Sequence, residues 1–317
     1  APDAEDADGF GSALATDGNV LLVTGNNGVY GFTRSEDGGW TPAGTIAAPE
    51  GEDVGFGAAL ALDGTTAFVA APLVAERNGA VHVFEWADGA WTQTGEISAP
   101  EAAAGGVFGS ALAFDSDHLF VGAPLANDRT GAVFAFRAGE AGWESAGELA
   151  SQQLARNDQF GMSLATGYGM VAVGAVGHAG AGAVFGFMPG AEGWMEGGRL
   201  VAFDGAPRTA FGASIAINDD GVWVGAPGAG RGVGATYLFA MNGMAIETVR
   251  KISPPADLAG RGLLGGALAA GSGFAALAAP GADNGAGTVV IYEGEDTGWS
   301  AVASVYSPAE GFDAVVG

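Results

Sequence analysis

One short segment recurs at nearly constant spacing along the chain, and this recurrence constrains the fold more than any other feature. Phe-Gly pairs begin at residues 10, 56, 108, 160 and 211, and a sixth copy has become Leu264-Gly265. Successive copies are 46, 52, 52, 51 and 53 residues apart. A period near fifty residues indicates that each repeat is one supersecondary unit, which buries its apolar face against its neighbours. We therefore expect one repeat domain over residues 1–317, with repeats starting near these six positions.

The third repeat shows the pattern within one unit. It predicts strands over 108–114, 118–124, 131–136 and 144–150, with a loop over 125–130 between the second and the third. Asp115-Ser116-Asp117 supplies the first turn, and Asp17-Gly18 and Asp63-Gly64 stand at the same place in the first two repeats. Asp-Gly pairs tolerate the positive φ angles that tight hairpins need. Four short strands with turn signals every eight to twelve residues are typical of antiparallel β-structure.

These features predict an all-β fold, a β-propeller whose blades are four-stranded antiparallel sheets. A linear β-solenoid is the alternative, but its repeats are usually shorter and its strands parallel. Tryptophan opens the predicted fourth strand at residues 40, 91, 143, 194 and 299, whereas the fifth repeat has Met244 there. Because this place is fixed in the repeat, we interpret these rings as packing between adjacent sheets rather than as a set that stacks on a ligand.

Phe-Gly followed some twelve residues later by Gly-Ala-Pro resembles the FG-GAP repeat, the unit of integrin α-subunit propellers and of many secreted bacterial proteins. Gly122-Ala123-Pro124 and Gly225-Ala226-Pro227 match the second part intact. The copies that depart from it are Ala70-Ala71-Pro72, Gly174-Ala175-Val176, Ala278-Ala279-Pro280 and, most of all, Thr24-Gly25-Asn26. The resemblance covers residues 10–307 and implies the propeller fold, but one fold hosts many activities.

Two features depart from the family pattern. The best-known propellers of the family have seven blades, whereas this chain has six repeats and a restart at Phe312. We expect six blades with a terminal strand near residue 312, or seven if the chain continues or a partial blade forms. The family often carries a calcium loop between the first two strands, but here short turns stand at that place and cannot supply six to eight oxygens. We therefore expect no cofactor and no calcium at these turns.

The charge is strongly one-sided. With 36 acidic and 11 basic residues the net charge is −25, and such a field repels nucleic acid and anionic membranes. No apolar run is long enough to insert into a membrane, and the lack of cysteine excludes disulfides and Cys-based metal sites. Ala1-Pro2-Asp3 would suit a mature start left by signal-peptide cleavage, so we expect an extracellular or cell-surface protein.

Most arginines fall in the predicted loops. Three follow second strands and three lie between repeats, namely Arg77, Arg129 and Arg231, and Arg156, Arg208 and Arg261. In a propeller of this strand order both kinds of loop open on one face, which predicts a ring of guanidinium groups for a carboxylate, a sulfate or an acidic sugar. The alternative is exposed ion pairing with acids of the same loops, such as Glu76 and Asp128.

Acidic residues gather ahead of the first two Phe-Gly pairs. They are Asp3, Glu5, Asp6 and Asp8 in the first run, and Glu50, Glu52 and Asp53 in the second. The first run is a candidate for holding a cation through several carboxylates, and the alternative is a solvated chain terminus.

Signatures of catalysis are scarce. His82, His118 and His178 fall at different places in the repeat, which disfavours a shared metal centre, and neither a Gly-x-Ser-x-Gly elbow nor a P-loop is present. We therefore predict a non-catalytic extracellular binding or adhesion module, or a subunit of a surface assembly, with a protein or glycan partner at the cell surface. The alternatives are a lectin-like carbohydrate-binding protein and an enzyme, a lyase or hydrolase, working at the axial mouth of the propeller.

Overall fold

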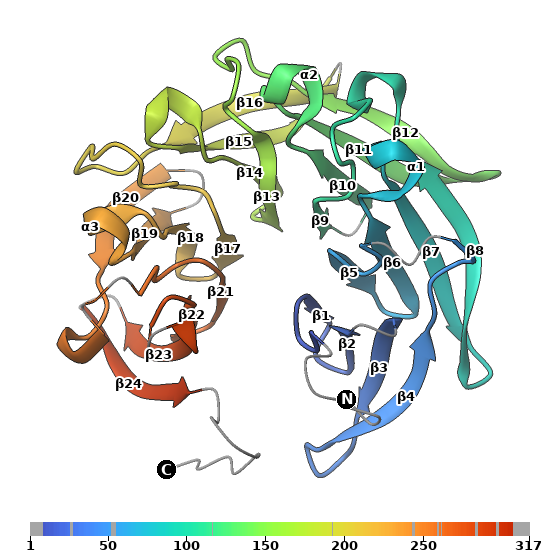
Figure 1. The fold of residues 1–317 in the computed structure, drawn as a ribbon, viewed down its shortest axis with the longest axis horizontal. Helices are drawn as coiled ribbons and strands as arrows, with labels where there is room; N and C mark the ends of the chain where they lie inside the picture. Colours follow the sequence, from blue (N-terminus) through green and yellow to red (C-terminus); the bar gives the residue numbers. More distant parts are fainter. Residues whose placement is uncertain are drawn as a thin grey trace. The chain divides into compact units, whose positions relative to one another are not determined.

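Six four-stranded antiparallel sheets follow one another along the chain, one for each repeat (Figure 1). They are seen in a computed structural model that describes residues 9–25, 28–51, 55–115, 117–191, 193–242, 245–258, 260, 262–282, 285–295 and 298–306. The fold is a six-bladed β-propeller, so the predicted fold class is confirmed. The strand expected near residue 312 lies outside the described residues.

Every sheet is a meander in which strands adjacent in sequence are paired. The first three sheets consist of β1 (Leu14–Thr16), β2 (Val20–Gly25), β3 (Gly28–Arg34) and β4 (Trp40–Ile46); β5 (Leu60–Asp63), β6 (Thr66–Ala71), β7 (Ala80–Ala87) and β8 (Ala90–Ser98); and β9 (Ala111–Phe114), β10 (His118–Ala123), β11 (Ala132–Gly139) and β12 (Gly142–Leu149). The last three consist of β13 (Phe160–Gly167), β14 (Met170–Ala175), β15 (Ala183–Gly190) and β16 (Gly193–Leu200); β17 (Ile215–Asn218), β18 (Gly221–Ala226), β19 (Ala235–Asn242) and β20 (Ala245–Ile252); and β21 (Leu268–Gly271), β22 (Phe274–Ala279), β23 (Thr288–Glu295) and β24 (Gly298–Tyr306).

Short helical turns occupy several loops. They are α1 (Val74–Arg77), α2 (Ala126–Arg129) and α3 (Ala229–Gly232), with the 3-10 turns η1 (Glu101–Ala103), η2 (His178–Gly180) and η3 (Ala256–Leu258). No helix within the described ranges is long and apolar enough to cross a membrane.

The chain divides into two compact units. One comprises Ala1–Leu164 and Gly190–Met195, the other Ala165–Pro189 and Glu196–Gly317, so the division passes through the fourth sheet. The single domain expected over residues 1–317 stays a prediction.

The predicted strand limits need corrections of one to three residues. The second, third and fourth strands of the third repeat are His118–Ala123, Ala132–Gly139 and Gly142–Leu149, rather than 118–124, 131–136 and 144–150. In the third repeat the first strand begins at Ala111 rather than at residue 108, because Gly109 has a φ of +96° and the Ser110 amide closes a turn onto the carbonyl of Val107. In the second repeat Asp63 pairs with Thr66, so the hairpin turn lies one residue later than expected. In both places a turn is displaced by one to three residues, and the strand order is unaffected.

The phenylalanine of the Phe-Gly pair is buried in the second to fifth repeats, whereas Phe10 in the first repeat is 41% exposed. Phe108 is fully buried and packs edge-on against Phe136 of β11, with ring centroids 5.8 Å apart. The Gly109 amide donates to the carbonyl of Gly122, the first residue of Gly-Ala-Pro, at 3.0 Å. The same bond recurs in four other sheets, as Gly11 to Thr24, Gly57 to Ala70, Gly212 to Gly225 and Gly265 to Ala278. The two halves of the repeated motif are therefore hydrogen-bonded to each other.

The same motif also holds consecutive sheets together. Gly131, just before β11, pairs in parallel with Phe160 of the following sheet, and Gly182 with Phe211 and Gly234 with Leu264 repeat this bridge. A Cβ added to Gly131 would lie 2.1 Å from the Phe160 carbonyl oxygen. Glycine is required there because the two backbones touch.

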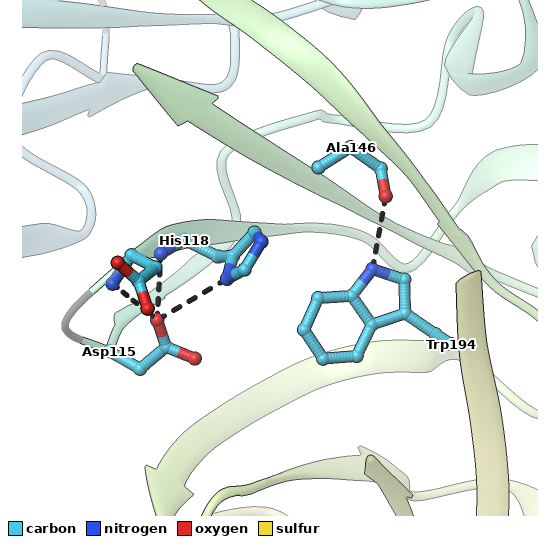
Figure 2. A network of polar contacts seen from close by, with 5 residues as sticks. Asp115, His118, Ala146 and Trp194 are labelled. Atoms are coloured by element: carbon cyan, nitrogen blue, oxygen red, sulfur yellow. Dashed lines mark hydrogen bonds and ion pairs between the residues drawn. The ribbon is translucent and has the colours of Figure 1, made fainter. Parts of the chain in front are cut away.

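Tryptophan side chains fill the space between neighbouring sheets. The Trp194 indole N–H donates to the carbonyl of Ala146 in the preceding sheet at 3.2 Å (Figure 2). The Trp194 ring also packs edge-on against Phe120, with centroids 4.9 Å apart. Three equivalent contacts involve Trp91 with Ala43, Trp143 with Phe68, and Trp299 with Trp223. The packing interpretation is confirmed for these four, which we call the inter-sheet tryptophans. It is wrong for Trp40, which belongs to the first sheet and is 41% exposed.

Candidate functional site

Three of the predicted arginines lie on turns with an unusual backbone. In α2, Asn127, Asp128 and Arg129 have φ angles of 53°, 58° and 67°, so the chain makes one turn of left-handed helix. The same left-handed conformation occurs in α1, where it includes Arg77, and in α3, where it includes Arg231. Each non-glycine residue held in this conformation costs about 1 kcal/mol. Such strain gathers at functional segments, which makes these turns candidates for binding.

Backbone hydrogen bonds fix these turns to the next sheet. The carbonyl of Arg129 accepts from the Gln159 amide at 2.9 Å, and the carbonyl of Arg77 accepts from the Val107 amide at 3.1 Å. Both arginine side chains are exposed. Each turn therefore has an anchored main chain and a guanidinium group in solvent.

The anchoring brings arginine-bearing loops together in pairs. Gln159 belongs to the connection that carries Arg156, so this connection adjoins the Arg129 turn. In the other unit the Gly228 amide donates to the carbonyl of Thr209 at 2.9 Å, which joins the Arg208 connection to the turn of Arg231. Arg156, Arg208 and Arg231 are exposed as well.

Arg261 lies outside the described residues, and the complete ring of six arginines stays a prediction. The alternative, in which these arginines pair with acids of their own loops, stays a prediction for Arg261. Within the described part of the chain, none of the other five has a carboxylate partner; the ion pairs formed there include Asp115 with His118 and Asp204 with Lys251. Asp158, two residues after Arg156, is buried and accepts from the Ala155 amide at 2.9 Å. Its carboxylate closes a turn.

The acidic candidates are less informative. Asp3, Glu5, Asp6, Asp8, Glu52 and Asp53 lie outside the described residues, whereas Glu50 is exposed. Carboxylates of the hairpin turns already accept main-chain amides, as Figure 2 shows for Asp115, whose Oδ1 accepts from Asp117 at 2.8 Å and from His118 at 2.7 Å. Among the side chains that the structure describes, no three His, Asp or Glu residues gather as metal ligands would.

The sequence reasoning missed a polar cluster around Lys251, the single lysine of the chain. Its ammonium group donates to Oδ2 of Asp204, and the Tyr237 hydroxyl donates to Oδ1 of the same carboxylate at 2.8 Å. The ammonium also lies 5.4 Å from the centre of the Tyr237 ring. These contacts tie the connection that carries Asp204 to β19 and β20. The rarity of lysine was visible in the sequence, but no spacing rule linked it to Asp204.

The three groups shift one another's ionisation. Burial alone would raise the pKa of Asp204, but the hydrogen bonds from Lys251 and Tyr237 outweigh it and lower the pKa. Burial, and then the bond to the Asp204 carboxylate, raise the pKa of Tyr237 to about 12. At neutral pH the cluster therefore holds a carboxylate, an ammonium and a neutral phenol.

Two segments of the chain match a known repeat family. A family model described as the FG-GAP repeat matches residues 91–136 and 194–239. These two segments of the chain match the FG-GAP repeat. The two matched segments are offset by 103 residues, which equals the distance from Phe108 to Phe211, so they lie in phase with the repeats. Each matched FG-GAP segment begins at an inter-sheet tryptophan and ends in the third strand of the next sheet. The family model thus spans the contact between two blades.

Solved structures with the same fold include two lyases. A virginiamycin B lyase from Staphylococcus aureus matches with a TM-score of 0.61 and 11% identity, over 94% of this chain and 85% of its own. A streptogramin B lyase matches with a TM-score of 0.63 and 10% identity, over 94% of this chain and 84% of its own. At such identities the likeness concerns the fold alone. No curated protein sequence matches the chain.

Proposed function

We propose that this protein is a non-catalytic binding module that takes up a carboxylate- or sulfate-bearing partner at the cell surface through its loop arginines. The observation that carries the proposal is the geometry of Arg129. Its carbonyl is held by the next sheet, while its guanidinium is exposed and has no partner among the described carboxylates. A guanidinium fork binds carboxylate or sulfate through two parallel hydrogen bonds. Because the turn is anchored, little backbone order has to be gained on binding.

The pairing of loops favours a partner with repeated acidic groups. Arg156 lies on the connection bonded to the Arg129 turn, and in the other unit the connection that carries Arg208 is bonded to the turn of Arg231. Once one acidic group is bound, a linked second group meets its arginine at high effective concentration. An acidic surface glycan and an acidic protein segment both satisfy this requirement.

The lectin alternative has less support. A sugar-binding aromatic platform needs an exposed ring face, whereas Trp91, Trp143, Trp194 and Trp299 are half-buried between sheets. Their indole groups stabilise the contact between blades.

The absence of catalysis is part of the proposal. The titles of the two similar structures name lyases, and the low identity carries no activity to this chain. We expect virginiamycin B to remain intact when it is incubated with the purified protein, as followed by mass spectrometry. Protein-dependent disappearance of virginiamycin B would contradict the non-catalytic assignment.

The binding test uses two probes with the same acidic group on different backbones, oligogalacturonate and an oligoglutamate peptide. We expect at least one of them to bind in biolayer interferometry, and the Arg129→Ala/Arg156→Ala variant to lose about tenfold in affinity, since two solvent-exposed charge contacts contribute about 1 kcal/mol together or more. Arg137→Ala is the matched control, because Arg137 is an exposed arginine on a strand of the same sheet. Equal affinity of the double variant and the control would reject the assignment of the loop arginines.

A further inference from the structure

The interface between the fourth and fifth sheets lacks an aromatic pair that is found at three other interfaces. In the second, third and fifth sheets the third residue of the second strand is a large aromatic that meets an inter-sheet tryptophan. The pairs are Phe68 with Trp143, Phe120 with Trp194, and Trp223 with Trp299, with centroids 4.6–4.9 Å apart. In the fourth sheet this residue is Ala172. In the fifth sheet Ile246 stands at the tryptophan place, because it pairs with Met241 as Trp143 pairs with Ala138, so the alignment of Met244 with the tryptophans is wrong. Both halves of the pair have been replaced.

A cavity of about 210 Å³ lies at this interface, between β14, β15 and β16 on one side and β18, β19 and β20 on the other. Its lining residues all belong to the unit that comprises Ala165–Pro189 and Glu196–Gly317. Gly186 contributes to its size, because the same place in the third strand holds Val83 in the second sheet and Leu238 in the fifth.

The lining is chiefly apolar and adaptable. Met170, Met188 and Met241 contribute flexible thioether side chains, and the buried Val184 and Val222 line it as well. An apolar cavity of about 150 Å³ in a protein interior is large enough to hold a benzene molecule. Thioether sulfur makes favourable contacts with aromatic rings. The cavity therefore suits a flat aromatic group somewhat larger than benzene.

The other interfaces show which polar group such a ring would carry. The indole N–H of Trp91 donates to the carbonyl of Ala43, and that of Trp194 donates to the carbonyl of Ala146. Both acceptors stand three residues after the tryptophan of their own strand, at Trp40 and Trp143. Gly197 stands three residues after Trp194 and lines the cavity. Its carbonyl occupies the place of the acceptor.

We propose that this cavity binds a free small aromatic heterocycle of the size of indole, with a ring N–H that donates to the Gly197 carbonyl. The ligand takes the place that a tryptophan side chain holds in the other interfaces. This site is independent of the arginine loops, and its test does not depend on the proposed function.

The test is a titration of the whole protein, labelled with carbon-13 in its methionine methyl groups, with indole. We expect the methyl resonances of Met170, Met188 and Met241 to shift together on binding, while that of Met162, which is 46% exposed and does not line the cavity, stays in place. Indene, which has the shape of indole without the N–H, should bind about three- to tenfold more weakly because the Gly197 carbonyl then lacks its donor.

A pair of glycine variants checks the location. Gly198→Leu places a side chain in open space at the cavity and should weaken indole binding at least tenfold, because a Cβ there meets no atom within 4 Å. Gly95→Leu is the control, since Gly95 stands at the same place in the second sheet, four residues after Trp91, and also has room for a Cβ. Unmoved methionine resonances at millimolar indole in the wild-type protein would overturn the proposal, whether or not the variants fold. Equal binding by Gly198→Leu and Gly95→Leu, or tighter binding of the tripeptide Gly-Trp-Gly than of indole, would do so as well.

Discussion

Gly131 is a position where one added carbon atom, a Cβ, would clash with the backbone of the next sheet. Its φ of +89° favours glycine, and the neighbouring backbone at Phe160 leaves no room for a Cβ. Gly38 has nearly the same φ, +86°, but a Cβ there would meet no atom within 4 Å. The two positions therefore separate the cost of backbone conformation from the cost of a steric clash.

We expect Gly38→Ala to lower the free energy of unfolding by about 1 kcal/mol and Gly131→Ala to lower it by about 3 kcal/mol or more, since only the second adds a clash between backbones. Urea denaturation followed by tryptophan fluorescence measures both. Similar losses in the two variants would mean that the contact between consecutive sheets is looser than described.

The Asp204 cluster predicts a pH-dependent contribution to stability. The pKa of Asp204 is lower in the folded protein, so its contribution is complete above the unfolded value of about 3.9 and disappears as the pH falls through the folded pKa. Asp204→Asn should lower the stability between pH 5 and 8, and the difference from wild type should shrink as the pH falls through the folded pKa of Asp204. Thermal unfolding across this range checks the prediction. A constant difference at every pH would assign the loss to packing rather than to the carboxylate charge.

Sequence reasoning located the loop arginines but not their conformation. Arg77 and Arg129 were placed between second and third strands because the repeat pattern is regular there. The left-handed turns could not be predicted, because Asn127, Asp128 and Arg129 include no glycine to mark them. The contact of Lys251 with Asp204 joins residues 47 positions apart and leaves no local signal either.

At the scale of elements, the contact between sheets rests on the fourth-strand tryptophans. Trp194 is half-buried between two sheets and hydrogen-bonded, whereas Trp40 occupies the same place in its repeat and is 41% exposed. The repeat predicts both residues equally well. Trp194 contacts Ala146 and Phe120 of the preceding sheet, and a contact between two repeats is not visible in the pattern of one repeat.

We expect Trp194→Ala to lower the free energy of unfolding by about 3 kcal/mol, through the cavity and the lost hydrogen bond, and Trp40→Ala to lower it by less than about 1 kcal/mol. Chemical denaturation of the two variants under one condition gives the comparison. Equal losses would argue that these rings stabilise their own hairpins rather than the contact between sheets.

At the scale of the whole molecule, the net charge of −25 opposes compaction through self-repulsion. Salt shortens the screening length from about 30 Å at 0.01 M to about 3 Å at 1 M. The Tm should therefore rise by several degrees between low and high NaCl at pH 7, and less at about pH 4, where many carboxylates are protonated. Differential scanning calorimetry at several NaCl concentrations measures this change in Tm. A Tm that falls with salt at pH 7 would contradict a destabilising acidic surface.

We propose that this acidic protein exposes anchored arginines for an acidic partner. The most direct test follows the guanidinium Nε–H resonances by NMR during titration with oligogalacturonate or oligoglutamate, whichever binds. We expect the Nε–H resonances of Arg129 and Arg156 to shift and to saturate along the binding curve. The resonance of Arg137, on a strand of the same sheet, should stay in place. Saturable binding that leaves the resonances of Arg129 and Arg156 unchanged would contradict it.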